Sequence, residues 1–114
     1  MQQKLISCLS EDLRYKNNNN HHLAGFCYIL SEAYFHLSGG KNSGLKPCNI
    51  RHEGASHWYL VDKENNIIDL TASQFEKLPN YDEGRGRGFL TKLPSKRAKI
   101  LMERFLNKCG RKTK

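Results

Sequence analysis

The most restrictive feature of the sequence is the apolar segment "GFCYILSEAYFHLSGG", residues 25–40. Apolar side chains occupy most sides of this segment, and a helix without a clear polar face is usually a buried one. The pair Gly39-Gly40 is a common signal for the end of a helix. The segment therefore predicts a helix over about residues 25–37. Because 114 residues provide one modest core, we expect this helix at its centre.

The rest of the chain alternates helical and strand patterns. Apolar spacing predicts two more helices, at residues 2–14 and 95–108. Strand patterns and turn residues predict three strands, at residues 46–53, 56–63 and 66–70. The expected fold class is α+β, with a buried central helix packed on a small antiparallel β-sheet. We place a single domain at residues 1–107 and a basic, disordered tail at residues 108–114.

Less regular segments separate these elements. Residues 15–23 and 78–88 are polar or glycine-rich and are expected to be loops. Residues 71–77 are expected to form a helical turn, and residues 90–93 a last short strand. In the C-terminal helix, the side chains expected to face inward are Ile100, Leu101, Phe105 and Leu106.

Positive charge is concentrated at the C-terminal end. Residues 85–114 hold eleven Lys or Arg against one acid, Glu103, within a chain whose net charge is +8. Such a region is typical of weak binding to nucleic acid or another polyanion, but also of a solvated helix face followed by a tail. No apolar run is long enough to span a membrane, and the N-terminus lacks a signal-peptide core. We therefore expect a soluble, cytoplasmic protein.

The four cysteines do not form a metal or redox motif. None belongs to a C-x-x-C pair, and without a secretory signal we expect them to stay reduced. Cys48, His52 and His57 have the spacing C-x3-H-x4-H, to which His21-His22 would add ligands. His57 lies beyond the break at residues 53–55, so this alternative is weak. No metal or other cofactor is implied.

Three residues have the types and the order that thiol catalysis requires. Cys27 lies at the predicted start of a helix, where unpaired N–H groups and the helix dipole stabilise an anion. His57, in the second predicted strand, would exchange the proton of the thiol. Asp69, in the third, would fix the tautomer of the imidazole.

The hairpin turn decides whether His57 and Asp69 can meet. Side chains alternate between the faces of a strand, so the pair shares a face only in one register. A three-residue loop at residues 63–65 pairs Asp62 with Asn66 and places His57 diagonal to Asp69. Asn65 would then take the left-handed conformation that asparagine tolerates. A two-residue turn at Asn65-Asn66 would separate the pair.

Each member of the set also has a purely structural interpretation. A cysteine at a helix start is usually a small buried side chain. His57 is compatible with an ordinary strand position beside Trp58. Asp69 is compatible with a cap on the turn that follows it.

Longer segments resemble a known family. "SHWYLVDKENNIIDLTASQF" is similar to the "SHYWN…DG…IDLT..QF" segment of the YunG-like family of small bacterial and phage proteins. "AGFCYILSEAYFHLSGG" resembles that family's "GQC" or "GHC" segment followed by a helix, and "GRGRGFLTKLPSKRAKILMERF" resembles the ending of its phage-type members. The order of Cys, His and Asp is similar to that of papain-like thiol enzymes of the transglutaminase and arylamine N-acetyltransferase type. The resemblance implies a papain-like core with Cys27 as nucleophile, His57 as base and Asp69 as orienting carboxylate.

The resemblance includes one departure and leaves a competing function open. Many relatives have Gln or His before the cysteine, where this chain has Phe26, so an oxyanion would need backbone N–H groups, an asparagine of "NNNN" or His22.

The expected function is a thiol-dependent hydrolase or acyl transferase acting on an amide, ester or thioester. Further side chains expected to contact its unknown acyl or protein substrate are Trp58, Arg85, Arg87 and His22. The alternative is a non-catalytic, phage-type protein that contacts a host protein or nucleic acid through its basic C-terminal region.

Overall fold

The computed structural model describes residues 2–10, 13, 26–52, 55–72, 77–86, 88–89 and 94–108. Three α-helices lie in this part of the chain: α1 (Gln2–Ile6), α2 (Cys27–Leu37) and α3 (Lys96–Lys108). Four strands accompany them: β1 (Lys46–His52), β2 (Ala55–Val61), β3 (Ile67–Ile68) and β4 (Arg85–Gly86). Two short 3-10 helices, η2 (Gly40–Ser43) and η4 (Tyr81–Glu83), lie between them. The predicted α+β class is confirmed.

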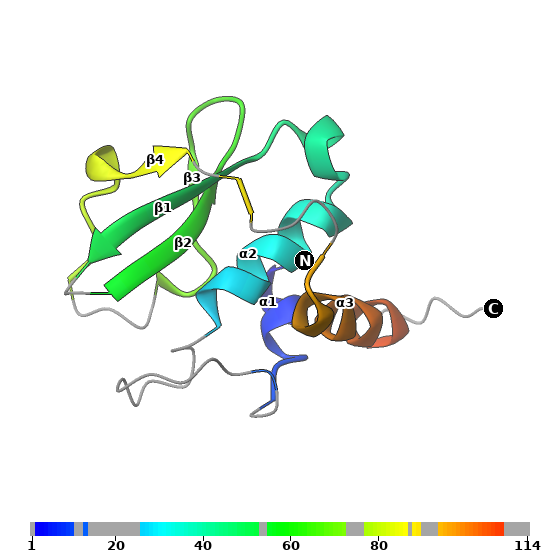
Figure 1. The fold of residues 1–114 in the computed structure, drawn as a ribbon. Helices are drawn as coiled ribbons and strands as arrows, with labels where there is room; N and C mark the ends of the chain where they lie inside the picture. The colour runs from blue at the N-terminus through cyan, green and yellow to red at the C-terminus, as the bar shows by residue number, and fades with distance from the viewer. Residues whose placement is uncertain are drawn as a thin grey trace.

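The four strands form one antiparallel sheet in the order β3-β2-β1-β4. β1 and β2 pair along their whole length, from Lys46 opposite Val61 to His52 opposite Ala55. The two outer strands are short and lie at opposite edges, so β1 and β2 form the centre of the sheet. Figure 1 shows these two long strands beside α2, with α3 at the far side of the helix layer.

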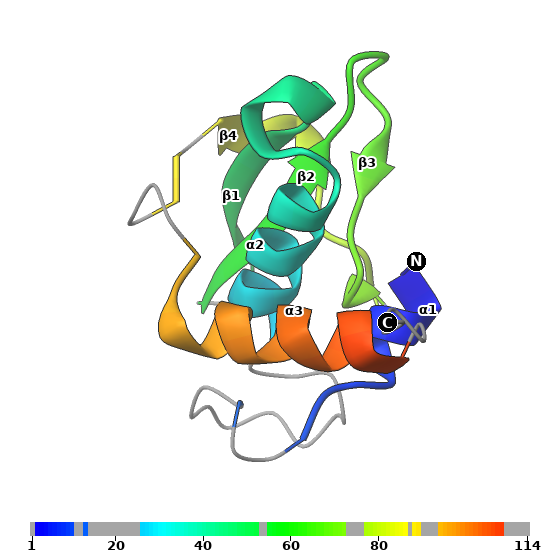
Figure 2. The same cartoon turned by 90° about the vertical axis from the view of Figure 1, so that its right-hand side faces the viewer.

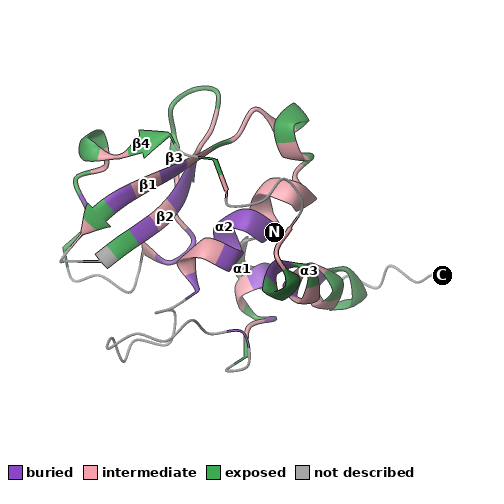
Figure 3. Ribbon diagram, in the orientation of Figure 1, coloured by how far each residue is buried: buried purple, intermediate pink, exposed green. Residues whose placement is uncertain are grey.

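The predicted central helix packs between the sheet and α3, as the turned view shows (Figure 2). Its inward side chains Ile29, Leu30 and Ala33 belong to the main hydrophobic core, which also includes residues of α1 and α3. Ser38 caps the helix, and Gly39 and Gly40 follow it with φ of 118° and 63°. The predicted stop at the glycine pair is therefore confirmed. In Figure 3 the buried residues lie in the middle of α2 and at alternate positions of the central strands, whereas much of α3 is exposed.

A buried carboxylate joins α2 to the start of α3. Glu32 is fully buried, and its two oxygens accept hydrogen bonds from Ser95 N–H at 2.9 Å and Ser95 Oγ at 2.7 Å. Ser95 in turn caps α3, because its Oγ accepts from Ala98 N–H at 3.3 Å. A negative charge near the N-terminus of a helix also interacts favourably with the helix dipole. Glu32 therefore links the start of α3 to the central helix.

Three local predictions were wrong. α1 ends at Ile6 rather than near residue 14, because the chain tightens there: Cys8 N–H bonds to Leu5 O, and the Ser7 hydroxyl bonds to Lys4 O at 2.6 Å. Residues 78–88 are not loop throughout, since Arg85–Gly86 pairs with β1 as β4. Leu106 does not face inward but is 39% exposed, whereas the buried side chains of α3 are Ala98, Leu101 and Phe105.

Candidate active site

The β2–β3 hairpin has the register that joins His57 to Asp69. Leu60 pairs with Ile68 and Val61 with Ile67, and Asp62 N–H donates to Asn66 O. Asn65 has a φ of 67°. Of the two turns considered, the structure therefore has the three-residue loop at 63–65 with its left-handed asparagine. This register, continued past β3, places Asp69 diagonal to His57 on the same face.

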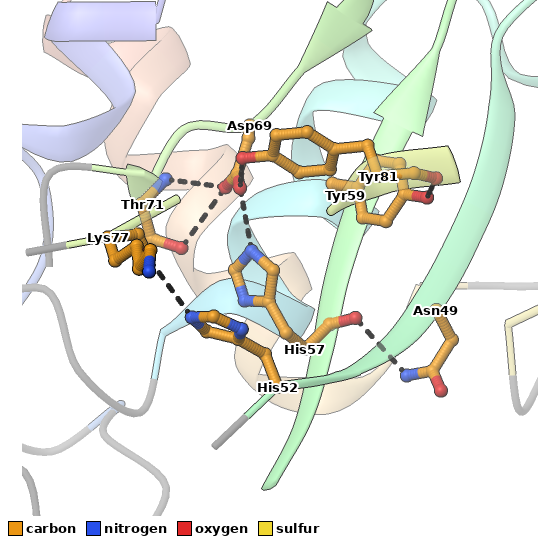
Figure 4. A network of polar contacts seen from close by, with 8 residues as sticks. All are labelled: Asn49, His52, His57, Tyr59, Asp69, Thr71, Lys77 and Tyr81. Carbon is orange, nitrogen blue, oxygen red and sulfur yellow. Dashed lines mark hydrogen bonds and ion pairs between the residues drawn. The ribbon is translucent and has the colours of Figure 1, made fainter. Parts of the chain in front are cut away.

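The two side chains are in direct contact, and both are buried. His57 Nε2 lies 2.7 Å from Asp69 Oδ2, and the exposed fractions of the two side chains are 4% and 3% (Figure 4). A carboxylate oxygen accepts, so Nε2 carries the proton and Nδ1 is the ring nitrogen left for another partner. A buried pair of this kind holds the imidazole in one orientation.

Asp69 is held by more than the histidine. Its Oδ2 also accepts from the Tyr81 hydroxyl at 2.7 Å, while its Oδ1 accepts from Thr71 N–H at 3.2 Å and from Thr71 Oγ1 at 3.4 Å. These bonds occupy both oxygens of the carboxylate. The predicted capping role of Asp69 on the following turn and its contact with His57 therefore exist together.

Cys27 is the first residue of α2, next to this pair. Its side chain is half-buried, and it lies within hydrogen-bonding reach of the His57 imidazole. The residue before it, Phe26, is 2% exposed and makes no side-chain cap hydrogen bond to the helix. The first N–H groups of an α-helix have no partner within the helix, and together with the helix dipole they make this end favourable for a negative charge. The structure thus brings Cys27, His57 and Asp69 together.

The environment of His57 favours its protonated form. Burial is the largest influence and acts to lower the pKa, but hydrogen bonds and charges from Asp69 and Cys27 outweigh it and raise the pKa to about 9. At neutral pH the ring is therefore an imidazolium. Partial burial and the bond to Asp69 also raise the pKa of the Tyr81 phenol, so this hydroxyl stays protonated and donates.

The residues predicted to contact substrate are less closely grouped. Trp58 points to the face of β2 opposite His57 and packs edge-on against Tyr28, the neighbour of Cys27, with ring centroids 5.0 Å apart. Arg85 is exposed on β4, where its guanidinium donates to two backbone carbonyls of the preceding turn. Arg87 and His22 lie outside the described residues.

Sequence reasoning missed Tyr81. It lies in the segment interpreted as a polar loop, and its distance along the chain from Asp69 gives no periodic signal. The one hint is an aromatic residue among Pro, Asn, Asp and Gly, which is unusual for a solvated loop. Tyr81 instead covers the second hydrophobic cluster, formed by Cys48, Ile50 and Tyr59.

The residues of the zinc alternative are engaged elsewhere. Cys48 packs in the cluster with Tyr59, and burial raises the pKa of its thiol. His52 Nε2 lies 3.1 Å from Lys77 O, and His57 contacts Asp69. Within the described ranges, no group of three or more His, Cys, Asp and Glu side chains is placed to hold a metal ion.

Fold and site together define an α+β domain in which a helix-start cysteine lies beside a buried histidine–aspartate pair. No family model, curated protein or solved structure matches this chain. The YunG-like and papain-like resemblance therefore stays a prediction. Of the helices that the structure describes, none is long and apolar enough to cross a membrane.

Proposed function

We propose that this protein is a thiol-dependent hydrolase or acyl transferase with Cys27 as its nucleophile. The observation that carries the proposal is the buried 2.7 Å contact between His57 Nε2 and Asp69 Oδ2, with Cys27 within reach of the same imidazole. The buried side chains of His57 and Asp69 each need a polar partner. A hydrophobic core between helices and a sheet can form without such a pair. Their position beside a half-buried thiol supports chemistry at that thiol.

The three side chains have separate roles in the proposed reaction. The Cys27 thiolate attacks the carbonyl carbon of an amide, ester or thioester, while His57 holds the proton taken from the thiol. When the tetrahedral intermediate collapses, His57 gives this proton to the leaving amine, alcohol or thiol, and an acyl–Cys27 thioester remains. Water or another acceptor then releases the acyl group, with His57 accepting its proton. Asp69 keeps Nε2 protonated and the ring oriented.

Electrostatics favour the protonated form of His57. His57 is an imidazolium at neutral pH because its pKa is raised to about 9. A neighbouring imidazolium and a helix N-terminus are two of the surroundings that stabilise a thiolate in proteins. Since Phe26 supplies no polar group, backbone N–H groups at the start of α2 are the donors we assign to the oxyanion.

The test is alkylation of Cys27 with iodoacetamide at pH 6, read by mass spectrometry. Cys8 and Cys48 are buried and will react slowly for that reason alone, so a fast wild-type Cys27 is not sufficient. The decisive comparison is Cys27 in wild type and in His57→Ala, where we expect a loss of at least about tenfold at pH 6. Glu64→Gln, exposed in the turn of the same hairpin, is the matched control and should react like wild type. Equal Cys27 rates in wild type and His57→Ala would refute the proposal.

Substrate class needs a second experiment. Wild type and Cys27→Ala should be incubated with aryl ester, thioester and amide panels, and covalent acyl adducts measured by intact mass. We expect adducts on wild type alone. No adduct with any acyl class, together with unchanged reactivity in His57→Ala, would leave the binding function as the better conclusion.

The binding alternative rests on a different surface. The basic side chains Lys96, Arg97, Lys99 and Lys108 are exposed on α3, away from the main core. Such a face can contact phosphates without sequence preference, and its affinity would fall steeply with salt. A salt-dependent affinity for DNA that is lost in Lys96→Ala/Lys99→Ala, without any dependence on Cys27, is the result that would favour it.

A further inference from the structure

Tyr81 is a half-buried polar contact of the site to which the proposed reaction assigns no role. Its hydroxyl lies 2.7 Å from Asp69 Oδ2, the same oxygen that accepts from His57 Nε2 at 2.7 Å (Figure 4). The oxygen is therefore shared between two short hydrogen bonds. Thr71 occupies only the other oxygen, Oδ1.

The Tyr81 ring is held from several sides. It begins η4, whose turn closes by hydrogen bonds from Glu83 N–H to Asn80 O and from Gly84 N–H to Tyr81 O. Tyr59 donates its hydroxyl to Tyr81 O at 3.3 Å, and the two rings meet edge-on with centroids 4.9 Å apart. The phenol is thus placed by a turn and by β2 together, before any substrate binds.

A second hydrogen-bond donor on one carboxylate oxygen weakens the hydrogen bond between that oxygen and the first donor. Each hydrogen bond withdraws electron density from the acceptor, so an oxygen that already accepts from a phenol is a weaker acceptor for the imidazole N–H. The second donor also restrains the carboxylate, which would otherwise be fixed by His57 and Thr71 alone. Both effects act on His57 through Asp69, without contact between Tyr81 and the reacting atoms.

We propose that Tyr81 is a positioning residue that fixes Asp69 and, by sharing Oδ2, limits how strongly the carboxylate stabilises the imidazolium form of His57. Its part in the reaction rests on the proposed function above. In that reaction, His57 must hold a proton during attack and release it to the leaving group. If Asp69 Oδ2 accepted only from the imidazolium, the stronger hydrogen bond would stabilise the imidazolium and make His57 slower to give its proton to the leaving group.

The protonation states are consistent with this arrangement. The pKa of Tyr81 is raised by partial burial and by Asp69, so its hydroxyl donates throughout the neutral range. The groups that act on His57 are Asp69 and, from α2, Cys27. Tyr59 and Cys48 are also close by, and burial raises the pKa of both, so they stay neutral at this pH.

The experiment is an NMR titration of the His57 ring in the full chain. In Tyr81→Phe the ring is retained and only the donor is lost, so we expect the pKa of His57 to rise above the wild-type value by about half a unit or more. Tyr34→Phe removes a hydroxyl from a half-buried tyrosine of α2 and is the matched control, with no shift expected. An unchanged or lowered pKa of His57 in Tyr81→Phe would overturn the proposal.

A second variant guards against a simple loss of folding. Tyr59→Phe removes the longer 3.3 Å bond to Tyr81 O but leaves the Tyr81 hydroxyl in place, so its shift should be smaller than that of Tyr81→Phe. Equal shifts in the two variants would also count against the proposal. Alkylation of Cys27 is measured separately in the same samples. If the pKa of His57 moves while Cys27 reactivity does not depend on His57, then the proposed function fails and the Tyr81 contact stands.

Discussion

Protonation of His57 should make the stability of the protein depend on pH. A histidine in an unfolded chain has a pKa of 6.5, and in the folded protein the pKa is about 9. Between these values the folded state binds a proton that the unfolded state has lost, so the free energy of unfolding falls as the pH rises. The contribution is fully present below pH 6.5 and is lost as the pH passes through about 9.

The size of the effect follows from the shift itself. At about 1.4 kcal/mol per pKa unit, the shift of His57 corresponds to about 3 kcal/mol of unfolding free energy. That is a large share of the stability of a typical small domain. The His57 and Asp69 side chains are only 4% and 3% exposed, so solvent screens their contact little.

The assay is urea unfolding of wild type at pH 6 and at pH 9.5, compared with His57→Gln and Asp69→Asn. We expect the wild-type advantage over either variant to shrink by about 3 kcal/mol between the two pH values. Asp62→Asn is the control, because hydrogen bonds from Asn66 lower the pKa of Asp62 and confine its titration to acid. A wild-type advantage over His57→Gln that is equal at pH 6 and pH 9.5 would refute the reasoning.

Two further predictions concern the framework of the site. Glu32→Ala should lower the free energy of unfolding by about 3 kcal/mol, because two hydrogen bonds to a buried carboxylate are lost at the start of α3. The control is Glu103→Ala, at an exposed position of α3, which should change the melting temperature little. Gly84→Ala would place a Cβ 1.8 Å from Tyr59 Oη, and we expect about 1–3 kcal/mol of destabilisation together with altered His57 ring signals in NMR spectra. Gly88→Ala has nothing within 4 Å of its added Cβ and should behave like wild type, so equal melting curves for the two glycine variants would contradict the close packing at Gly84.

The parts of the structure that sequence reasoning predicted are those decided locally. The apolar helix, the glycine stop and the pairing of His57 with Asp69 depend on residues within one turn or one hairpin. The loop at 63–65 is the clearest case, because Asn65 tolerates a φ of 67° and thereby sets the register of every residue in the hairpin. A single two-residue turn in its place would have moved Asp69 to the other face.

Only the tertiary structure decided the contacts between segments that lie far apart in the chain. Tyr81 reaches Asp69, and Glu32 reaches Ser95, because separate segments dock on the same core. Arg85–Gly86 becomes a strand by pairing with β1, although two residues carry no strand signal of their own. Periodicity and turn chemistry report on neighbours along the chain, whereas these contacts depend on how helices and strands pack. The amino-acid sequence by itself thus identified His57 and Asp69 as a pair that one of two hairpin turns would form, and the tertiary structure decided the turn and the positions of Cys27 and Tyr81 beside the pair.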